Sequence, residues 1–167
     1  TERFPIWIAA NAPTAIERAA RYGDAWFVNP HSKLSELKKG KRRYDAVCED
    51  LNKDPSVPVF REAFVAPTTE EAFDIARPYL KQKYDRYLEW GQDEAMGDGD
   101  DLHEVFDTLA EDRFLIGTPA EVCEEIDRYE AELDADRMLL RMRWPGLPQE
   151  RVTDSIQLVG DEVIPNL

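Results

Sequence analysis

Four times along the chain, a short run of hydrophobic residues is followed by a stretch in which hydrophobic residues recur every three or four positions. A short apolar run bounded by turn residues is typical of a buried strand, and the three-to-four spacing is typical of an amphipathic helix. The predicted strands are residues 6–10, 25–28, 57–65 and 137–142. The pattern therefore predicts a chain in which strands and helices alternate.

Signals for helix starts and stops support this division. Pro13 lies near the start of the first predicted helix and Gly23 ends it. The sequence TPAE at 118–121 supplies a threonine cap, a proline in the first turn and a glutamate at the capping-box position. Further helices are predicted over 34–51 and 152–163.

The third unit is longer than the others. A helix is predicted to begin after Thr68, and Pro78 is predicted to kink or restart it. An acidic loop at 97–101 and a short helix follow before the strand–helix alternation resumes. We therefore expect a single domain over residues 1–167 with a helical insertion at about 79–112.

The connections between the predicted strands contain no tight hairpin signal such as Asn-Gly. Strands separated by helices call for a parallel sheet with right-handed crossovers, which makes the fold class α/β. Four parallel βα units form either a small doubly wound sheet or half of a (βα)8 TIM barrel. The hydrophobic pattern alone leaves both open.

Composition narrows the range of partners. The chain carries 35 acidic and 21 basic residues, for a formal net charge of −14. Such a surface repels phosphates, so we expect no nucleic acid and no membrane among its partners, and small molecules or proteins instead. No stretch approaches the ~18 apolar residues of a membrane span, and no charged leader precedes an apolar run. We expect a cytoplasmic protein.

Common catalytic motifs are missing from the sequence. There is no HExxH, no clustered acid–histidine pattern, no GxSxG and no glycine-rich phosphate loop after a strand. We therefore predict that the protein binds no metal. Cys48 and Cys123 are expected to be reduced, packed thiols.

Three stretches resemble a known family. They are PIWIAANAPTAIERAARYGDAWF at 5–27, FLIGTPAEVCEEIDRYEAEL at 114–133 and SIQLVGDEVIPNL at 155–167. Together they resemble the C-terminal half of the bacterial luciferase-like flavin- and deazaflavin-dependent oxidoreductases. The resemblance implies that the four units are strands five to eight of a (βα)8 barrel. One departure is Asp134, at a helix end where the family often has glycine.

The resemblance also implies a cofactor, FMN or the deazaflavin coenzyme F-420, held at the carboxyl ends of the strands. Small side chains at Ala9, Ala10, Asn11 and Ala12 would let the backbone approach the anionic end of the cofactor. The helix that follows would offer unpaired N–H groups and a partial positive charge. Asn11 is expected to contact the cofactor, to cap this helix, or both.

Three residues near the ends of later strands are candidates for substrate binding. His31 either binds a substrate or lies in a surface loop. Arg143 either holds an anionic substrate group or pairs with one of the many acids, and Trp144 either walls an aromatic ligand or packs beneath Pro145. No catalytic side chain is predicted.

Three functions stay open on this basis. The first is the C-terminal portion of a luciferase-like oxidoreductase acting on a small-molecule substrate. The second is a non-catalytic half-barrel that self-associates through its open strand edges. The third is a barrel with sugar-phosphate chemistry, in which Asn11 and Arg143 hold a phosphate. In each case we expect a homo-oligomer or pairing with an N-terminal half-barrel.

Overall fold

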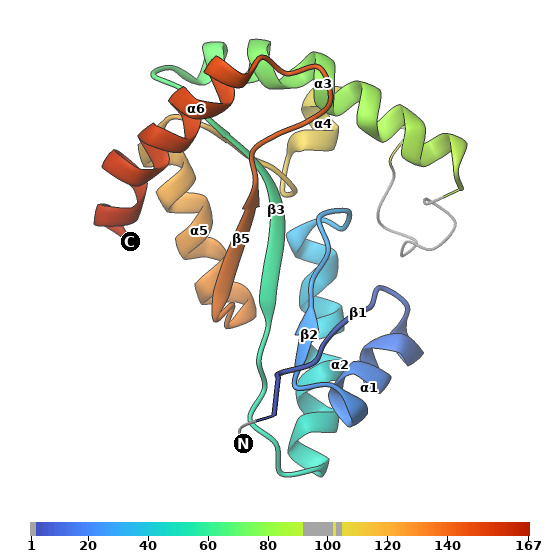
Figure 1. Cartoon of the computed structure of the whole chain (residues 1–167). Helices are drawn as coiled ribbons and strands as arrows, with labels where there is room; N and C mark the ends of the chain where they lie inside the picture. Colours follow the sequence, from blue (N-terminus) through green and yellow to red (C-terminus); the bar gives the residue numbers. More distant parts are fainter. Residues whose placement is uncertain (1–2, 92–101, 103–104) are drawn as a thin grey trace.

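A computed structural model describes residues 3–91, 102 and 105–167 (Figure 1). The predicted acidic loop at 97–101 lies outside these residues. The elements, in chain order, are β1 Trp7–Ala9, α1 Pro13–Tyr22, β2 Ala25–Phe27, α2 Leu34–Asp50, β3 Pro58–Val65, α3 Thr69–Glu89, α4 Phe106–Ala110, β4 Leu115–Gly117, α5 Pro119–Leu133, β5 Arg137–Arg141, α6 Gln149–Leu158, the π-helical turn η2 Val159–Val163 and the 3-10 turn η3 Ile164–Asn166.

The four predicted strands lie side by side and run parallel. β1 pairs with β2, and β3 pairs with β5 along residues 58–62 and 137–141. β2 joins β3 through Val28, whose N–H donates to the Pro58 carbonyl at 2.9 Å and whose carbonyl accepts from the Phe60 N–H at 2.9 Å. The strand order β1-β2-β3-β5 confirms the predicted α/β class of consecutive parallel βα units.

A fifth strand, β4, was not predicted. Its three residues pair in parallel with Ala63–Val65 at the carboxyl end of β3, on the edge opposite β5. The run of residues 115–117 is too short to show a strand pattern by itself. Its pairing depends on the long β3, which extends past the end of β2.

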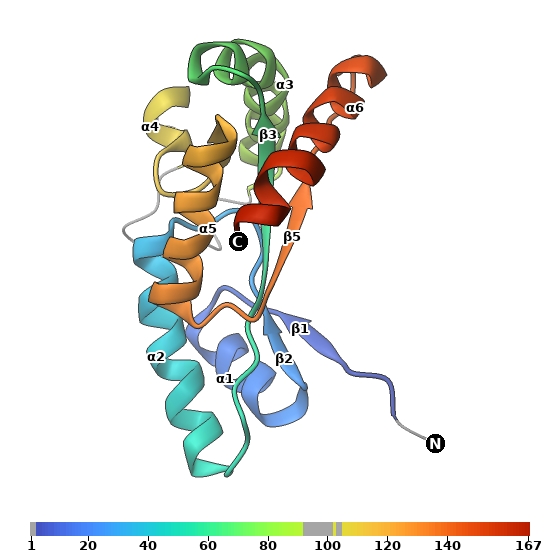
Figure 2. The same ribbon diagram turned by 90° about the vertical axis from the view of Figure 1, so that its left-hand side faces the viewer.

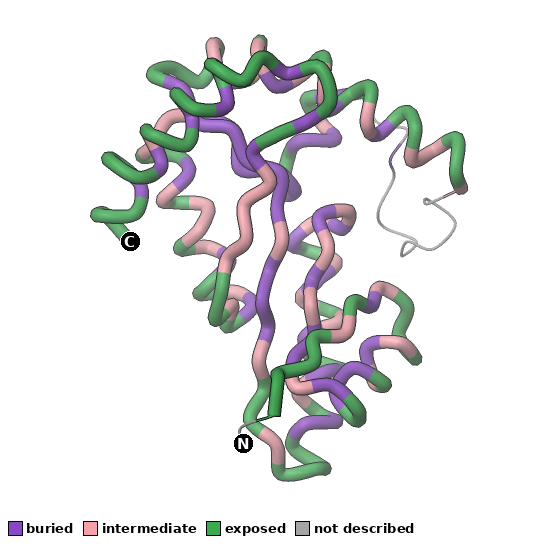
Figure 3. Tube along the Cα trace, in the orientation of Figure 1, coloured by how far each residue is buried: buried purple, intermediate pink, exposed green. Residues whose placement is uncertain are grey.

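The two faces of the sheet differ in what covers them. α2 and α5 lie on one face of the strands (Figure 2), and the tube of β3 is buried over most of its length (Figure 3). On the other face Trp7, Phe27 and Phe60 stack side by side, with ring centroids 6.0 and 5.9 Å apart. Trp7 remains 37% exposed, so this aromatic face is only partly covered in the chain.

The end signals predicted around α5 can be checked against the structure. The capping box at 118–121 is present, since the Glu121 N–H donates to Thr118 Oγ1 and the Thr118 N–H donates to Glu121 Oε2. Asp134 adopts the left-handed conformation (φ 50°), which lets it end α5 without glycine. At Pro78, α3 continues as one helix, so of the two predicted outcomes the restart does not occur.

The prediction of a single domain with an insertion at about 79–112 stays a prediction. Within the described part of that range lie the second half of α3 and the short α4. None of the helices that the structure describes has the length and hydrophobicity needed to cross a bilayer.

Candidate functional site

The parallel strands end at one edge of the sheet, which we call the rim. In parallel α/β folds, residues that follow different strands meet at this edge. Here the rim carries Asn11 after β1, the loop 29–32 after β2, and Arg143 and Trp144 after β5. Glu62, within β3, lies level with the end of β5 because it pairs with Arg141.

The loop 29–32 is held in place by buried side chains from three other elements. Arg61 on β3, Arg113 before β4 and Tyr84 on α3 together engage all four of its carbonyl groups. The bonds run from Arg61 Nη1 to the carbonyl of Asn29 (2.6 Å), from Arg61 Nη2 to Ser32 (3.2 Å), from Arg113 Nε to His31 (2.6 Å) and from Tyr84 Oη to Pro30 (3.1 Å). A loop with every carbonyl paired is preorganised before any ligand arrives.

Arg61 is the centre of this arrangement. Its side chain is 0% exposed, and its Nε donates to Tyr129 Oη on α5 at 2.6 Å. The guanidinium carbon also lies 4.9 Å from the centroid of the Tyr129 ring. The arginine therefore fastens the rim of β2 to a helix on the covered face of the sheet.

Asn11 belongs to the rim rather than to the helix cap. Its Oδ1 accepts a hydrogen bond of 2.5 Å from Asn29 Nδ2, and Asn29 Oδ1 accepts from the His31 N–H at 3.1 Å. The N-cap of α1 is Ala12, which makes no side-chain cap bond, so the predicted cap role of Asn11 is wrong. The bond to Asn29 leaves the Asn11 Nδ2 group without a partner among the described residues.

A cavity of about 340 Å³ lies between α1 and α2 next to the end of β1, and we call it the exit cavity. Ala10 and Asn11 line it together with Trp26, whose Nε1 donates to the Ala10 carbonyl at 2.8 Å. Two cations also line it, but each already pairs with a carboxylate at 2.7 Å, Lys39 with Glu36 and Arg43 with Glu17. The unpaired donors there are amides rather than charged groups.

His31 is enclosed by aromatic rings. It meets the edges of Tyr87 and Tyr84, with centroids 4.9 and 6.3 Å away. Burial, then the charges of Lys83 and other nearby cations, lowers its pKa to about 4, so the ring is neutral at neutral pH. Its Nδ1 is buried with no hydrogen-bond partner among the described residues. His31 therefore lies in a loop, but it is only partly exposed and packs against aromatic rings.

Glu62, which the sequence analysis did not single out, is the one carboxylate buried in this part of the rim that the structure describes. It is 0% exposed and forms an ion pair with Lys83 on α3. Its Oε2 accepts from Trp144 Nε1 at 2.6 Å, and Arg141 Nη1 lies 3.5 Å from Oε1. One carboxylate thus ties together β3, α3, β5 and the loop after β5.

Glu62 borders a second cavity of about 610 Å³, which lies between α3 and the loop after β5. We call it the aromatic cavity. Its lining residues are Tyr79, Gln82, Lys83, Arg86, Tyr87, Trp90, Arg141, Arg143, Trp144 and Pro145. Of the predicted substrate residues, Arg143 and Trp144 line this cavity, and His31 packs against its Tyr87 wall.

The sequence of the chain matches the model of one protein family, described as luciferase-like monooxygenase, over residues 1–135. The chain belongs to this family. No curated protein matches its sequence significantly.

Solved structures of luciferase-like proteins share the fold. A monooxygenase from Streptomyces bottropensis superimposes with a TM-score of 0.76 at 20% identity, covering 97% of this chain and 48% of its own. The oxygenating constituent of 3,6-diketocamphane monooxygenase from Pseudomonas putida, in complex with FMN, gives 0.73 at 17% identity, covering 96% and 48%. The coenzyme F-420-dependent tetrahydromethanopterin reductase from Methanopyrus kandleri gives 0.68 at 19%, covering 98% and 51%. This luciferase-like chain therefore spans about half the length of these structures.

The four residues predicted to face the cofactor divide into two pairs. Ala10 and Asn11 line the exit cavity, whereas Ala9 and Ala12 are exposed and do not line it.

Sequence reasoning missed Arg61 and Glu62, although one signal was available. Two adjacent charged residues interrupt an otherwise apolar strand, and charges in such a place require partners inside the fold.

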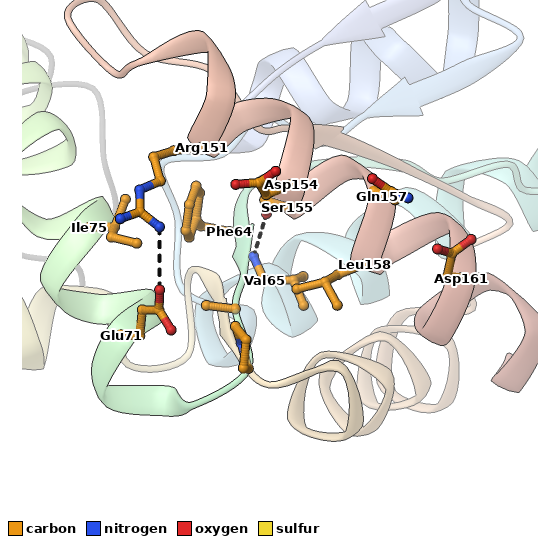
Figure 4. A pocket seen from close by; sticks show the side chains of 12 residues that line it. Phe64, Val65, Glu71, Ile75, Arg151, Asp154, Ser155, Gln157, Leu158 and Asp161 are labelled. Carbon is orange, nitrogen blue, oxygen red and sulfur yellow. Dashed lines mark hydrogen bonds and ion pairs between the residues drawn. The ribbon is translucent and has the colours of Figure 1, made fainter.

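A third cavity, of about 430 Å³, lies between α3 and α6 beyond the end of β3 (Figure 4). At its floor the Val65 N–H donates to Ser155 Oγ at 2.7 Å. Asp154 and Asp161 line it, and its Arg151 lies 3.5 Å from Glu71. Its carboxylates make this cavity a poor place for the anionic end of a cofactor.

Proposed function

We propose that this chain is the cofactor-binding C-terminal portion of a luciferase-like oxidoreductase that uses FMN or coenzyme F-420. Membership of the family and the fold support the general class. Among the structural neighbours, one contains FMN and another depends on coenzyme F-420. The observation that carries the proposal is the gathering of the exit cavity, the fixed loop 29–32 and the aromatic cavity along one rim.

The exit cavity fits the anionic end of either cofactor. The first turn of α1 has no side-chain cap. Pro13 has no N–H and the Ala15 N–H donates to the Ala12 carbonyl at 2.9 Å, so the Thr14 N–H is the first-turn donor that would meet a ligand oxygen. Asn11 adds the free Nδ2 donor, which Asn29 holds in position through Oδ1. The small Ala10 side chain leaves room for close approach. These are the groups that would bind a phosphate at this point.

The neighbouring loop fits a planar ring. His31 is neutral and packs edge-on against Tyr87, with ring centroids 4.9 Å apart, so this wall adds no charge beside a bound ring. When bound, a flavin or deazaflavin supplies hydride or oxygen chemistry by itself. The chain's task is therefore to bind the cofactor, orient it and exclude water.

We further propose that an N-terminal half-barrel completes the site. The partly exposed aromatic face of Trp7, Phe27 and Phe60 has the position of a barrel interior. β1 is an edge strand, and Phe4 and Ile6 beside it are 91% and 49% exposed. Such an edge favours pairing with further strands. The same surface supports the alternative function of a non-catalytic half-barrel that self-associates.

Equilibrium dialysis of the chain against FMN and against coenzyme F-420 tests the proposal. We expect saturable binding of at least one of them, weakened about tenfold by Asn11→Ala through the loss of one hydrogen bond to a charged group. Asn166→Ala, at the C-terminal end of the chain, serves as the control and should bind like the wild type. If neither cofactor binds at ~1 mM, or if both asparagine variants bind like the wild type, the proposal is wrong. Absence of binding together with sedimentation as a dimer would favour the non-catalytic half-barrel.

A further inference from the structure

The aromatic cavity has a charge opposite to that of the chain. The protein carries a net charge of −14, yet four of the ten residues that line this cavity are cations. The described residues of the lining include no carboxylate. Glu62, the buried acid beside it among the described residues, is shared between Lys83 and Arg141. The local excess of positive charge is therefore a property of the site and not of the surface as a whole.

Two of the four cations have no acidic partner within the part of the chain that the structure describes. Arg86 on α3 and Arg143 after β5 form no ion pair with any residue that the structure describes, although 35 acidic residues are present in the chain. Lys83 and Arg141, in contrast, are fixed by Glu62 at the side of the cavity. A ligand anion would meet two unpaired guanidinium groups backed by two positioned cations.

Aromatic rings supply the rest of the lining. Tyr87 packs against Trp90 with centroids 6.0 Å apart, and Lys83 Nζ lies 5.1 Å from the Tyr87 centroid. Trp144 is 2% exposed and oriented by its bond to Glu62. These rings offer flat surfaces for stacking, and the volume of about 610 Å³ matches a small-molecule site.

We propose that the aromatic cavity binds the substrate, and that this substrate is a planar aromatic acid. Its ring would stack against Tyr87 and Trp90, at the wall that the edge of Trp144 helps to form, and its carboxylate would face Arg86 and Arg143. A neutral hydrocarbon would bury these cations without compensation, which disfavours it. Calling this ligand a substrate rests on the function proposed above, whereas the expectation that the cavity binds an aromatic acid does not.

The four tryptophans provide a site-resolved test. We would titrate 15N-labelled chain with 2-naphthoate and follow the four indole N–H signals, assigned by single Trp→Phe variants. Ligand in the aromatic cavity should shift the signals of Trp144 and Trp90. Ligand on the open aromatic face of the sheet would shift Trp7 instead, and ligand in the exit cavity would shift Trp26.

The neutral analogue 2-naphthalenemethanol has the same ring without the charge and should bind at least about tenfold more weakly. Arg143→Gln and Arg86→Gln should each weaken 2-naphthoate binding by about tenfold as well. Arg137→Gln, which removes a cation near Trp7, is the control and should bind like the wild type. Shifts confined to Trp7 or Trp26, equal binding of both naphthalenes, or full affinity in both glutamine variants would overturn the proposal. Asn11→Ala should leave 2-naphthoate binding unchanged, which separates this test from that of the cofactor site.

Discussion

Replacing Arg61 with methionine tests whether the loop after β2 depends on a buried cation. Methionine keeps much of the length of the side chain and removes every donor. The change takes away the bonds to the carbonyls of Asn29, Ser32 and Phe60 and to Tyr129 Oη. Because Arg61 is 0% exposed, water does not readily replace the guanidinium at these positions.

The size of the effect follows from the groups left behind. A buried acceptor without a partner costs about 1–3 kcal/mol, and the variant removes the guanidinium partner of three carbonyls and one hydroxyl. Part of this cost is offset, since the variant no longer has to desolvate a guanidinium. We expect the free energy of unfolding to fall by about 3 kcal/mol, which lowers the urea midpoint by roughly 1–2 M.

Urea unfolding followed by circular dichroism measures this directly. Arg137→Met is the matched control, since Arg137 is exposed and pairs only with its neighbour Asp136 among the described residues. Its midpoint should stay at the wild-type value. An Arg61→Met midpoint equal to that of Arg137→Met would refute the reasoning that the buried arginine holds the loop.

Three further predictions concern the rim. Burial and nearby cations lower the pKa of His31 from 6.5 to about 4. Between these two pH values His31 is protonated in the unfolded chain but neutral in the folded chain, so the free energy of unfolding falls as the pH is lowered, by about 3 kcal/mol in total. Urea unfolding of His31→Gln should lack this part of the pH dependence, and parallel pH profiles would contradict the assignment. Gly40→Ala raises the helix propensity of α2 by about 1 kcal/mol, but the new Cβ would lie 2.7 Å from the Trp26 ring. We therefore expect this variant to lower the free energy of unfolding by about 1–3 kcal/mol. A raised melting temperature would argue against that packing. Glu62→Gln keeps an acceptor for Trp144 but leaves Lys83 and Arg141 without a carboxylate. We expect urea unfolding to show a decrease of about 2 kcal/mol in the free energy of unfolding, less than for a fully buried ion pair because both cations reach solvent. Wild-type stability of this variant would count against the network.

Much of the fold was predictable because it rests on local signals. The four strands β1, β2, β3 and β5 are apolar runs between turn residues, and α5 begins at a complete capping box. These signals depend on sequence neighbours, so they survive without knowledge of the tertiary structure. The short β4 was not predicted because it forms a strand only by pairing with β3, which is remote in sequence.

The candidate site was only partly predictable for a similar reason. Parallel topology places Asn11 and Trp144 at one rim, which the order of elements already indicated. The burial of Arg61 and Glu62 depends on partners that lie 68 and 82 residues further along the chain, Tyr129 and Trp144. No local pattern reveals such partners, which is why the polar network had to come from the structure.

Asn11 illustrates how a correct motif can receive a wrong role. A small polar residue before a helix predicts an N-cap, but the cap position falls on Ala12. Asn11 instead reaches across to Asn29 at the end of the neighbouring strand. A cross-strand contact at the rim replaced the expected local one.

The most direct test of the account is the response of the Trp26 indole signal to FMN and coenzyme F-420. Trp26 donates to the Ala10 carbonyl at the wall of the exit cavity, so it reports the place where the anionic end should bind. We predict a saturable shift of this signal with at least one of the two cofactors, and loss of that shift at the same concentration in Asn11→Ala. A cofactor that binds while the Trp26 signal stays fixed would contradict the account.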